Sequence, residues 1–371
     1  MTTHRIAALP GDGIGKEVLA SAQLVLEEVG ARFGFGFAWT QYGWGCEYYT
    51  KHGRMMPFDG LEQLAENESI LLGAVGYPGV DDHVSLWGLL IPIRRGFEQY
   101  VNLRPIRLLR GTTSPIRALN SDAGDRLDFV CVRENNEGEY SEIGGRMYRG
   151  TSQEVAVQES VFTRRGVERV MRYAFGLASE RRGDLASATK SNGIIHTMPF
   201  WDEIFAELAG VYSNVSVSEY HIDALAAMFV LDPQRFDVVV ASNLFGDILT
   251  DLGAAVVGSI GIAPSANLNP EGDHPSMFEP VHGSAPDIAG KGIANPIGQI
   301  WSGAMMLDHL GHGEASRGLL EAVETVLEHG VRTPDLGGTA TTEEVTHAII
   351  DALGDTVDAD RTTGSSEGRQ P

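Results

Sequence analysis

The hydrophobic positions of the chain follow two repeating patterns, one typical of buried strands and one typical of amphipathic helices. Residues 5–9 form a short apolar run, and apolar side chains recur at helical spacing between residues 16 and 29. Residues 235–242 have the composition of a buried strand, and they lead into residues 243–253, which have a helical pattern. Strands that alternate with helices in this way predict an α/β protein.

The same two patterns recur through the rest of the chain. Further strands are expected at residues 35–42 and 70–78, at the beginning of 128–145, at 154–162, and in the stretch that ends at Lys190. Further helices are expected at residues 58–66, 164–179, 198–208, 299–311, 314–329 and 341–353, and after residue 85, where Pro92 interrupts the spacing. The sequence after Gly261 predicts loops as far as residue 298. Residues 356–371 are polar and predict a disordered tail.

Length and composition limit the classes of protein that the chain can represent. A chain of 371 residues favours two domains over one. The net charge of −22 argues against binding to nucleic acid or to an anionic membrane surface. No apolar run has the length of a transmembrane helix, and the first residues lack the apolar core of a signal peptide. Cys46 and Cys131 are the only cysteines, so a reducing cytoplasm is the expected location.

A glycine-rich loop follows the first expected strand and precedes the first expected helix. Gly11, Gly13 and Gly15 leave the Rossmann pattern G-x-G-x-x-G incomplete. The Walker A pattern fails as well, because Pro10 replaces its first glycine and Glu17 replaces its hydroxyl residue. The loop still allows a ligand to approach backbone amides at a helix N-terminus.

Asp247 and Asp251 lie four residues apart in the expected helix 243–253. Residues at this spacing share one helix face, so the two carboxylates repel each other. A divalent cation with oxygen ligands would offset this repulsion. Acidic side chains are also favoured in the first turn of a helix by its dipole, and both interpretations remain open on these residues alone.

Several cationic and polar residues stand where expected strands or helices begin or end. Arg94 and Arg104 belong to an arginine-rich segment that is a candidate dicarboxylate site, because guanidinium groups bind carboxylates bidentately; the alternative is a solvated face. Lys190 is one of only four lysines and lies at a strand end. Arg133 also ends a strand, with Tyr140 beyond it, and Asp223 begins a helix as a cap or a metal ligand.

Seven motifs in the same order resemble the β-decarboxylating hydroxyacid dehydrogenases, the family of isocitrate, 3-isopropylmalate, homoisocitrate and tartrate/D-malate dehydrogenases. The resemblance covers roughly residues 5–353. The motifs are LPGDGIGKEV, RRGFEQYVNLRP, VRENNEGEY, TKSNG, HIDALAAMFV, NLFGDILTDLGAAVVGSIGIAPSANL and FEPVHGSAPDIAGKGIANPIG.

The resemblance implies an α/β fold of the isocitrate/isopropylmalate dehydrogenase type, which is not a Rossmann fold. Two domains would share a long mixed sheet of twelve strands. Residues 1–100 and 258–371 would form the NAD-binding domain, and residues 101–257 the substrate and dimerisation domain, with a clasp around residues 135–165. The active site would lie in the cleft between the domains of a homodimer, and both subunits would contribute to it.

The resemblance also assigns roles in the active site. Arg94, Arg104 and Arg133 would bind the substrate carboxylates. Asp247 and Asp251, with Asp223 of the partner subunit, would hold Mg²⁺ or Mn²⁺. Lys190 of the partner subunit would act as the base, and Tyr140 would protonate the carbon that carbon dioxide leaves. Pro92 and Gly96 depart from an uninterrupted helix and put the position of Arg94 in question.

The cofactor implied by the resemblance is NAD, and a monovalent-cation requirement stays open. An acid at position 287 matches members that use NAD, because a carboxylate accepts hydrogen bonds from a ribose 2′-hydroxyl and repels a 2′-phosphate. The expected cofactor-binding residues are Ile14, Glu279, His282, Gly283, Ser284, Ala285, Asp287, Ile288 and Asn295.

The substrate within this family is expected to be tartrate or D-malate, because the combination of SLWG, QYVNLRP, RENNEGEY and TKSNG is most similar to those dehydrogenases. Leu90 and Ile91 would also suit an apolar group, which keeps 3-isopropylmalate as an alternative. Ser85 lies one turn from the place of the serine that isocitrate enzymes use. A second alternative is a non-catalytic regulatory homologue from an NAD-isocitrate dehydrogenase assembly. No nucleic acid or membrane partner is expected.

Overall fold

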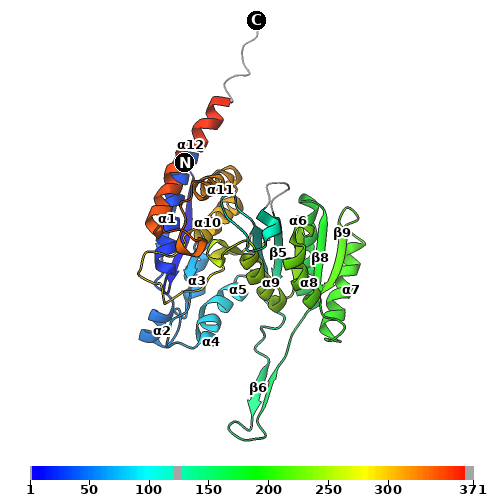
Figure 1. The fold of residues 1–371 in the computed structure, drawn as a ribbon. Helices are drawn as coiled ribbons and strands as arrows, with labels where there is room; N and C mark the ends of the chain where they lie inside the picture. Colours follow the sequence, from blue (N-terminus) through cyan, green and yellow to red (C-terminus); the bar gives the residue numbers. More distant parts are fainter. Residues whose placement is uncertain (1, 121–126, 364–371) are drawn as a thin grey trace.

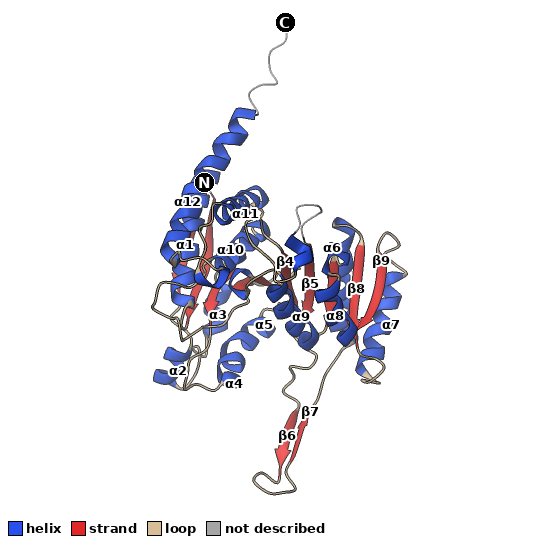
Figure 2. Ribbon diagram, viewed as in Figure 1, coloured by secondary structure: helices blue, strands red, loops and turns tan. Residues whose placement is uncertain are grey.

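A mixed sheet of ten strands is the centre of the computed structural model, which describes residues 2–120 and 127–363, with side chains as far as residue 354 (Figure 2). In spatial order the strands are β2 (Phe35–Gln41), β1 (Thr2–Gly11), β3 (Ser69–Ala74), β12 (Ser276–Pro280), β11 (Pro264–Leu268), β4 (Val101–Arg107), β5 (Asp128–Glu134), β10 (Val238–Ala241), β8 (Asp184–Thr189) and β9 (Ser216–His221).

The sheet consists of two parallel parts that are joined by antiparallel strands. Strand β11 is antiparallel to both of its neighbours, β12 and β4, and β4 is antiparallel to β5, whereas the other neighbouring strands are parallel. The predicted domain boundary after residue 100 falls directly before β4, where the two parts of the sheet meet. The domain assignment itself stays a prediction.

Helices cover the sheet on both sides. Helices α1, α10, α11 and α12 pack together beside the N-terminal strands, and α6 to α9 surround the other end of the sheet (Figure 1). The helices are α1 (Gly15–Phe33), α2 (Cys46–His52), α3 (Gly60–Ala65), α4 (Asp82–Ser85), the π-helical η1 (Leu86–Leu90), α5 (Ile91–Gly96), α6 (Arg164–Glu180), α7 (Thr197–Ala209), α8 (Ile222–Leu231), α9 (Asn243–Val256), α10 (Ile297–His309), α11 (Gly313–Glu328) and α12 (Thr342–Thr363).

Alternate residues of the central strands pack into two different hydrophobic clusters. In β1, Ile6 and Ala8 belong to the larger cluster, and Ala7 and Leu9 belong to the cluster on the opposite face. Successive side chains of a strand point to opposite faces, so the strand is buried on both. This explains why residues 5–9 are a continuous apolar run instead of an alternating one.

The fold confirms most of the predicted elements and corrects others. The predicted helices 164–179, 198–208 and 314–329 correspond to α6, α7 and α11 with small shifts of their ends. The loop prediction after Gly261 was wrong where β11 and β12 form, because these two short strands carry buried polar side chains that hide an apolar pattern. The strand predicted at 154–162 covers only Val155–Gln158.

Two expectations about larger features also need correction. Twelve strands occur in the described residues, but ten form the main sheet and β6 (Gly144–Met147) and β7 (Val155–Gln158) form a separate hairpin. Helix α12 continues to Thr363, so the backbone of residues 356–363 is helical and not disordered. Residues 364–371 of the expected tail lie outside the described residues. None of the helices described here has the length and apolarity required to cross a membrane.

The hairpin β6–β7 extends away from the body of the molecule (Figure 1). Every residue of both strands is exposed. Several of the exposed side chains on and beside the strands are apolar, among them Ile143, Met147 and Val157. A two-stranded hairpin is at best marginally stable by itself in water, so this arm needs a surface to pack against. It lies within the range 135–165 that was expected to form a clasp.

Candidate active site

An irregular helical segment positions Arg94. The Ile91 N–H donates to the Leu86 carbonyl five residues earlier, which is the π-helical bond that ends η1. Pro92, which has no N–H, then lies in the first turn of α5, where no donor is required. Arg94 is only 8% exposed, and its Nη2 donates to Glu279 Oε1 at 2.7 Å. The proline therefore leaves Arg94 directed into the site.

Strand register places the other two arginines on the same face of the sheet. Arg133 of β5 lies opposite Asn102 of β4. Arg104 is two residues after Asn102 in β4, so its side chain lies on the same face of the sheet. Asn267 of β11 lies opposite Asn102 as well, and it donates to Glu279 Oε1 at 2.8 Å. Residues from four central strands therefore converge on one buried polar region.

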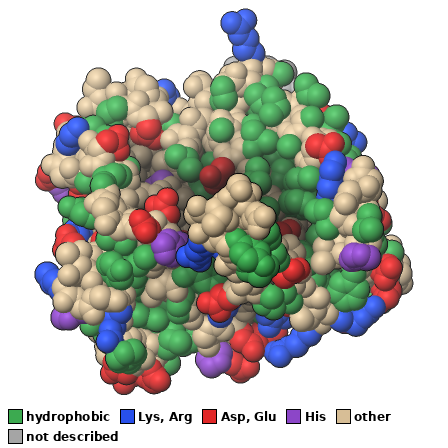
Figure 3. All heavy atoms as spheres, turned by 90° about the horizontal axis from the view of Figure 1, so that it is seen from below, with side chains coloured by type: hydrophobic (Ala, Val, Ile, Leu, Met, Phe, Trp, Pro, Cys, Tyr) green, Lys and Arg blue, Asp and Glu red, His purple; other side chains and the backbone are tan. Residues whose placement is uncertain are grey.

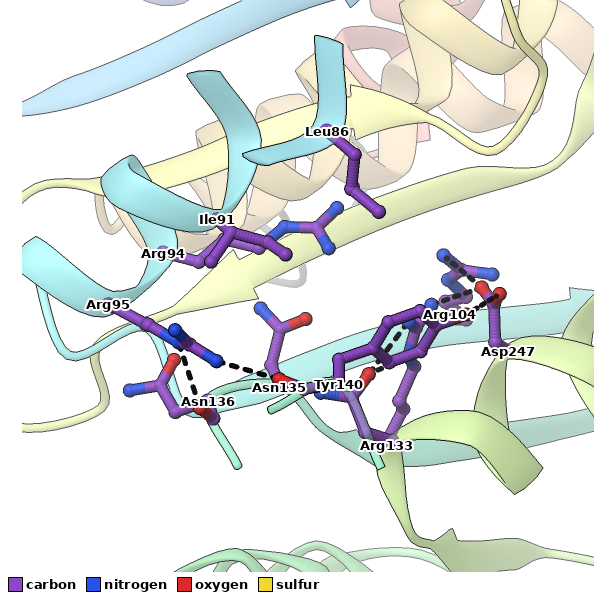
Figure 4. A pocket seen from close by; sticks show the side chains of 11 residues that line it. Leu86, Ile91, Arg94, Arg95, Arg104, Arg133, Asn135, Asn136, Tyr140 and Asp247 are labelled. Atoms are coloured by element: carbon purple, nitrogen blue, oxygen red, sulfur yellow. Dashed lines mark hydrogen bonds and ion pairs between the residues drawn. The ribbon is translucent and has the colours of Figure 1, made fainter. Parts of the chain in front are cut away.

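This polar region opens into a small cavity that α5 covers (Figure 4). Its volume is about 120 Å³. All three arginines that were predicted to bind the substrate line it, together with Tyr140 and Asp247. The complete lining consists of Leu86, Ile91, Arg94, Arg95, Arg104, Arg133, Asn135, Asn136, Tyr140, Asn243 and Asp247.

Asp247 is the anionic centre of the cavity. Arg133 donates to its Oδ1 through Nη1, and Arg104 Nη2 lies 3.6 Å from the same oxygen. Burial raises the pKa of the Asp247 carboxyl, but the charges of Arg133 and Arg104 outweigh burial and hold the pKa below its usual value. Burial, and then the charge of Arg104, lower the pKa of Arg133 to about 10. Arg133 therefore stays cationic at neutral pH.

Tyr140 donates a hydrogen bond from its hydroxyl to Asp247 Oδ2 at 3.0 Å. Burial raises the pKa of the phenol, and the Asp247 charge raises it further. Asp251, one turn further along α9, has a raised pKa because burial and the Asp247 charge outweigh Arg104, whose Nη1 is 3.8 Å away.

Lys190 and Asp223 lie together, but not at the cavity. The register pairs Thr189 of β8 with His221 of β9, so the residues that follow both strands meet at the same edge of the sheet. Lys190 Nζ donates to Asp223 Oδ1 at 2.6 Å, and this bond lowers the pKa of Asp223. In the described part of one chain, no three His, Cys, Asp or Glu residues form a group that could hold a metal ion.

The glycine loop packs against the segment predicted to bind the cofactor. A Cβ on Gly13, which has φ of +54°, would lie 2.0 Å from the Ser284 carbonyl oxygen, so only glycine permits this approach. The Ile14 N–H donates to the same oxygen at 2.8 Å. Ile14 also packs with Ala285 and Ile288 in a small apolar cluster at the start of α1.

The remaining predicted cofactor residues lie in or beside this segment, where Gly283 and Asp287 are both exposed. His282 is buried, its Nδ1 lies 3.0 Å from the Gly283 carbonyl, and its Nε2 has no partner in the described structure. Burial lowers the pKa of His282. Asn295 donates to Asp335 Oδ2 at 3.0 Å. Glu279 precedes this segment in strand β12, and its carboxylate accepts a hydrogen bond from Arg94.

Sequence reasoning missed the polar residues that hold the arginines and Tyr140 in place. Asn243, the first residue of α9, accepts from both Nε and Nη2 of Arg133 at 3.1 and 2.8 Å. Arg95 donates to the Tyr140 carbonyl at 2.7 Å. Asn135 and Asn136 line the cavity directly. For Asn135 and Asn136, the available signal was their position in RENNEGEY, at the end of the strand that carries Arg133.

The large mixed sheet that carries this site is the fold of the isocitrate/isopropylmalate dehydrogenases. A model of the isocitrate/isopropylmalate dehydrogenase family matches residues 5–351, and the chain belongs to that family.

Three relatives show which members the chain is similar to. It is 56% identical to the probable tartrate dehydrogenase/decarboxylase of Bacillus subtilis (strain 168), over 95% of this chain and 99% of the relative. It is 58% identical to the D-malate dehydrogenase [decarboxylating] of Escherichia coli (strain K12), over 94% and 98%. It is 55% identical to the tartrate dehydrogenase/decarboxylase of Pseudomonas putida, over 95% and 98%.

Solved structures agree on the fold. The structure of isocitrate dehydrogenase from Methylococcus capsulatus matches with a TM-score of 0.84 and 35% identity, over 94% of this chain and 99% of the other. The apo form of a beta-decarboxylating dehydrogenase from Thermococcus kodakarensis matches with a TM-score of 0.77 and 36% identity, over 99% and 100%.

Proposed function

We propose that the chain oxidises tartrate or D-malate with NAD⁺ and a divalent metal ion, and that it decarboxylates the product of oxidation. The observation that carries the proposal is the cavity of about 120 Å³ with Arg94, Arg104 and Arg133 in its walls. Three buried guanidinium groups around so small a space suit a short diacid, because each can bind a carboxylate bidentately. The names of the three relatives support the same substrates.

The carboxylates of α9 fit a divalent metal ion. Asp251 lies one turn from Asp247 on the same face of α9, so both carboxylates can act on one cation. Oxygen ligands of this kind suit Mg²⁺ or Mn²⁺. When bound, the ion would supply Lewis-acid stabilisation of the oxygen on the oxidised substrate. Asp247 lines the cavity and Asp251 lies one turn further along α9. Asp223 of the partner subunit is the proposed third ligand.

The loop segment around residue 284 fits an adenine dinucleotide. Its backbone lies close to the glycine loop at the start of α1, and His282 Nε2 is a buried polar atom without a partner in the described structure. Asp287 is exposed beside Ile288, where its carboxylate favours a free ribose 2′-hydroxyl. NAD⁺ is therefore the proposed cofactor. A lower KM for NADP⁺ than for NAD⁺ would contradict this assignment.

A homodimer with shared active sites explains why Lys190 and Asp223 lie away from the cavity of their own chain. Helices α8 and α9 expose apolar side chains to solvent, including Leu231 (74% exposed) and Ile248 (56% exposed). Seen from the end of the β6–β7 arm, hydrophobic side chains gather on the face beside the arm (Figure 3). Exposed apolar patches of this kind mark protein interfaces.

The proposed mechanism assigns one task to each residue. The three arginines orient the substrate carboxylates, and Lys190 of the partner subunit takes the proton from the C2 hydroxyl during oxidation. Tyr140 gives its proton to the carbon that carbon dioxide leaves. The raised pKa of Tyr140 keeps the phenol protonated at neutral pH, so that it can act as an acid.

Hybrid dimers test the shared site directly. Inactive Lys190→Ala and Tyr140→Phe subunits would be unfolded, mixed in equal amounts and refolded. One site of each hybrid contains both wild-type residues if the two come from different subunits, so random pairing restores about a quarter of wild-type activity. Matched samples of each variant refolded alone are the control. No recovery in the mixture would show that both residues act within one chain.

A substrate panel tests the reaction. Turnover of D-malate, tartrate, 3-isopropylmalate and isocitrate would be measured with NAD⁺ and Mn²⁺. Leu86 and Ile91 form an apolar part of the cavity wall, which favours 3-isopropylmalate as the second candidate. The Ser85 hydroxyl donates to the Asp82 carbonyl at 2.9 Å and does not line the cavity, which speaks against isocitrate. A dominant kcat/KM for 3-isopropylmalate would overturn the proposal, and no turnover at all would favour a non-catalytic regulatory homologue.

Two further assignments belong to the same proposal. Residues 1–100 with 258–371 form the cofactor domain, and residues 101–257 form the substrate and dimerisation domain. The antiparallel strands β11 and β4, which join the two parallel parts of the sheet, belong to different domains in this division and support it. A cytoplasmic location is supported by the free and buried thiols of Cys46 and Cys131.

A further inference from the structure

Asn135 lines the active-site cavity with an amide whose two ends have different roles. It lies one residue beyond β5, two residues after Arg133, and is 5% exposed. Its Nδ2 donates to the Gln99 carbonyl and to Asn267 Oδ1, both at 2.9 Å. Its Oδ1 is buried and has no partner in the described structure. In Figure 4 the amide lies between Arg94 and Tyr140.

A chain of hydrogen bonds fixes the orientation of this amide. Glu279 Oε1 accepts from Asn267 Nδ2 at 2.8 Å, so the Asn267 amide must present its oxygen to Asn135 and to Asn102. Asn135 must then direct its nitrogen toward Asn267. The reversed amide would place Asn135 Oδ1 against two acceptors, the Asn267 oxygen and the Gln99 carbonyl. The Asn135 oxygen is therefore held on the side of the amide that faces away from the Asn267 oxygen and the Gln99 carbonyl.

Two other acceptors at the cavity are already engaged by its donors. Asn243 Oδ1 accepts twice from Arg133, and Asp247 accepts from Arg133 and Tyr140. The arginines suit the carboxylates of a substrate, but they cannot accept a hydrogen bond from a hydroxyl. A buried acceptor without a donor loses its hydration without compensation, so a ligand that supplies the donor gains affinity.

We propose that Asn135 Oδ1 accepts a hydrogen bond from a hydroxyl group on C3 of the substrate, and that Asn135 thereby determines specificity. The inference rests on the proposed function and extends it. Tartrate carries the C3 hydroxyl, whereas D-malate has hydrogen there and leaves the acceptor unpaired. A site built to bond a substrate hydroxyl discriminates against the analogue that lacks it. The Asn135 oxygen favours tartrate over D-malate by about 10- to 100-fold.

The test is the ratio of kcat/KM for tartrate to kcat/KM for D-malate, measured with NAD⁺ and Mn²⁺. Asn135→Ala is expected to lower this ratio by about 10- to 100-fold. D-malate reports any general damage to folding or cofactor binding, because such damage affects both substrates. Asn102→Ala is the matched control. Asn102 also donates to Asn267 Oδ1, at 3.0 Å, and it has a buried oxygen without a partner, but it does not line the cavity.

The Asn102→Ala ratio is expected to equal that of the unmutated enzyme. An equal loss with both substrates in Asn135→Ala, or an unchanged ratio, would overturn the role of Asn135. Turnover of neither substrate by the unmutated enzyme would overturn the proposed function, and the inference with it.

A second measurement does not depend on the folding of a variant. Dissociation constants of the unmutated enzyme would be compared for tartrate and for the malate analogue with fluorine in place of the C3 hydroxyl, with Mn²⁺ present and NAD⁺ absent. Fluorine occupies similar space but has no hydrogen to donate. The analogue is expected to bind about 10- to 100-fold more weakly than tartrate. Equal affinities would contradict the proposed hydrogen bond.

Discussion

Glu134 makes the turn that carries the active-site residues sensitive to pH. Its side chain is fully buried next to Arg133, and its carboxylate accepts from the Asn136 N–H at 3.0 Å and from the Glu137 N–H at 2.8 Å. These bonds favour the charged form, but burial is the larger effect and raises the pKa from 4.5 to about 7. Burial therefore opposes ionisation of Glu134 in the folded chain.

The sign of the pH dependence follows from this shift. Between pH 4.5 and 7 the unfolded chain has released the proton of Glu134, whereas the folded chain still holds it. The folded state binds more protons, so the free energy of unfolding falls as the pH rises through this range. A shift from 4.5 to about 7 corresponds to about 3 kcal/mol at 1.36 kcal/mol per pKa unit.

Urea unfolding at pH 5, 6, 7 and 8 would measure this contribution, at one fixed protein concentration because the proposed dimer makes stability depend on concentration. Glu134→Gln has no proton to release. The free energy of unfolding of the wild type minus that of the variant is therefore expected to fall by about 2.5 kcal/mol from pH 5 to pH 8. This is less than the full effect of the shift, because the unfolded chain has already released most of this proton at pH 5. Glu139→Gln, in the same turn, reports the effect of an amide substitution by itself. A flat difference for Glu134→Gln would refute the reasoning.

Three further predictions concern the proposed dimeric site. Lys190→Ala is expected to lower kcat by at least about 10²-fold while the Kd for NAD⁺ stays unchanged in a fluorescence titration, and retained turnover would exclude Lys190 as the base. Asp247→Asn is expected to weaken Mn²⁺ binding by at least about 10-fold in calorimetry; unchanged affinity would mean that Asp247 serves only as the partner of Arg133. Leu231→Lys is expected to shift the protein toward monomers in analytical ultracentrifugation and to lower activity in parallel, because it places a charge in the proposed apolar interface; an unchanged sedimentation coefficient would exclude this face as the interface.

The elements that were predicted well are those with a strong local pattern. Helix α6 buries one face and exposes the other, so the apolar positions Val167, Val170, Met171 and Ala174 identify it without knowledge of its neighbours. Strand β11 is different. Its five residues are all buried, but Ser265 and Asn267 are polar because they bond to residues of other strands. Such a strand is recognisable only once its partners are known.

The same distinction applies to the site. Arg94, Arg104 and Arg133 were identifiable because an arginine beside an apolar strand or helix is unusual and the motifs around them are specific. Asn135, Asn243 and Arg95 were not, since their roles depend on which atoms lie opposite them after folding. Sequence gives the residue type and its place on an element, but not the direction of an amide. That direction is what makes Asn135 an acceptor at the cavity.

The pair Asp247 and Asp251 shows how folding separates two residues that look equivalent in sequence. Helical spacing predicts a symmetrical repulsion, yet the structure divides the compensating charge unequally. Asp247 pairs with Arg133 and Arg104 and accepts a hydrogen bond from Tyr140, and the pKa of its carboxyl is lowered. The pKa of the Asp251 carboxyl is raised. The arginines that compensate Asp247 are those proposed to bind the substrate carboxylates. A substrate that takes over these arginines leaves both aspartates with uncompensated charge, which is the condition that favours a divalent cation between them. Substrate and metal ion are therefore expected to strengthen each other's binding at this site.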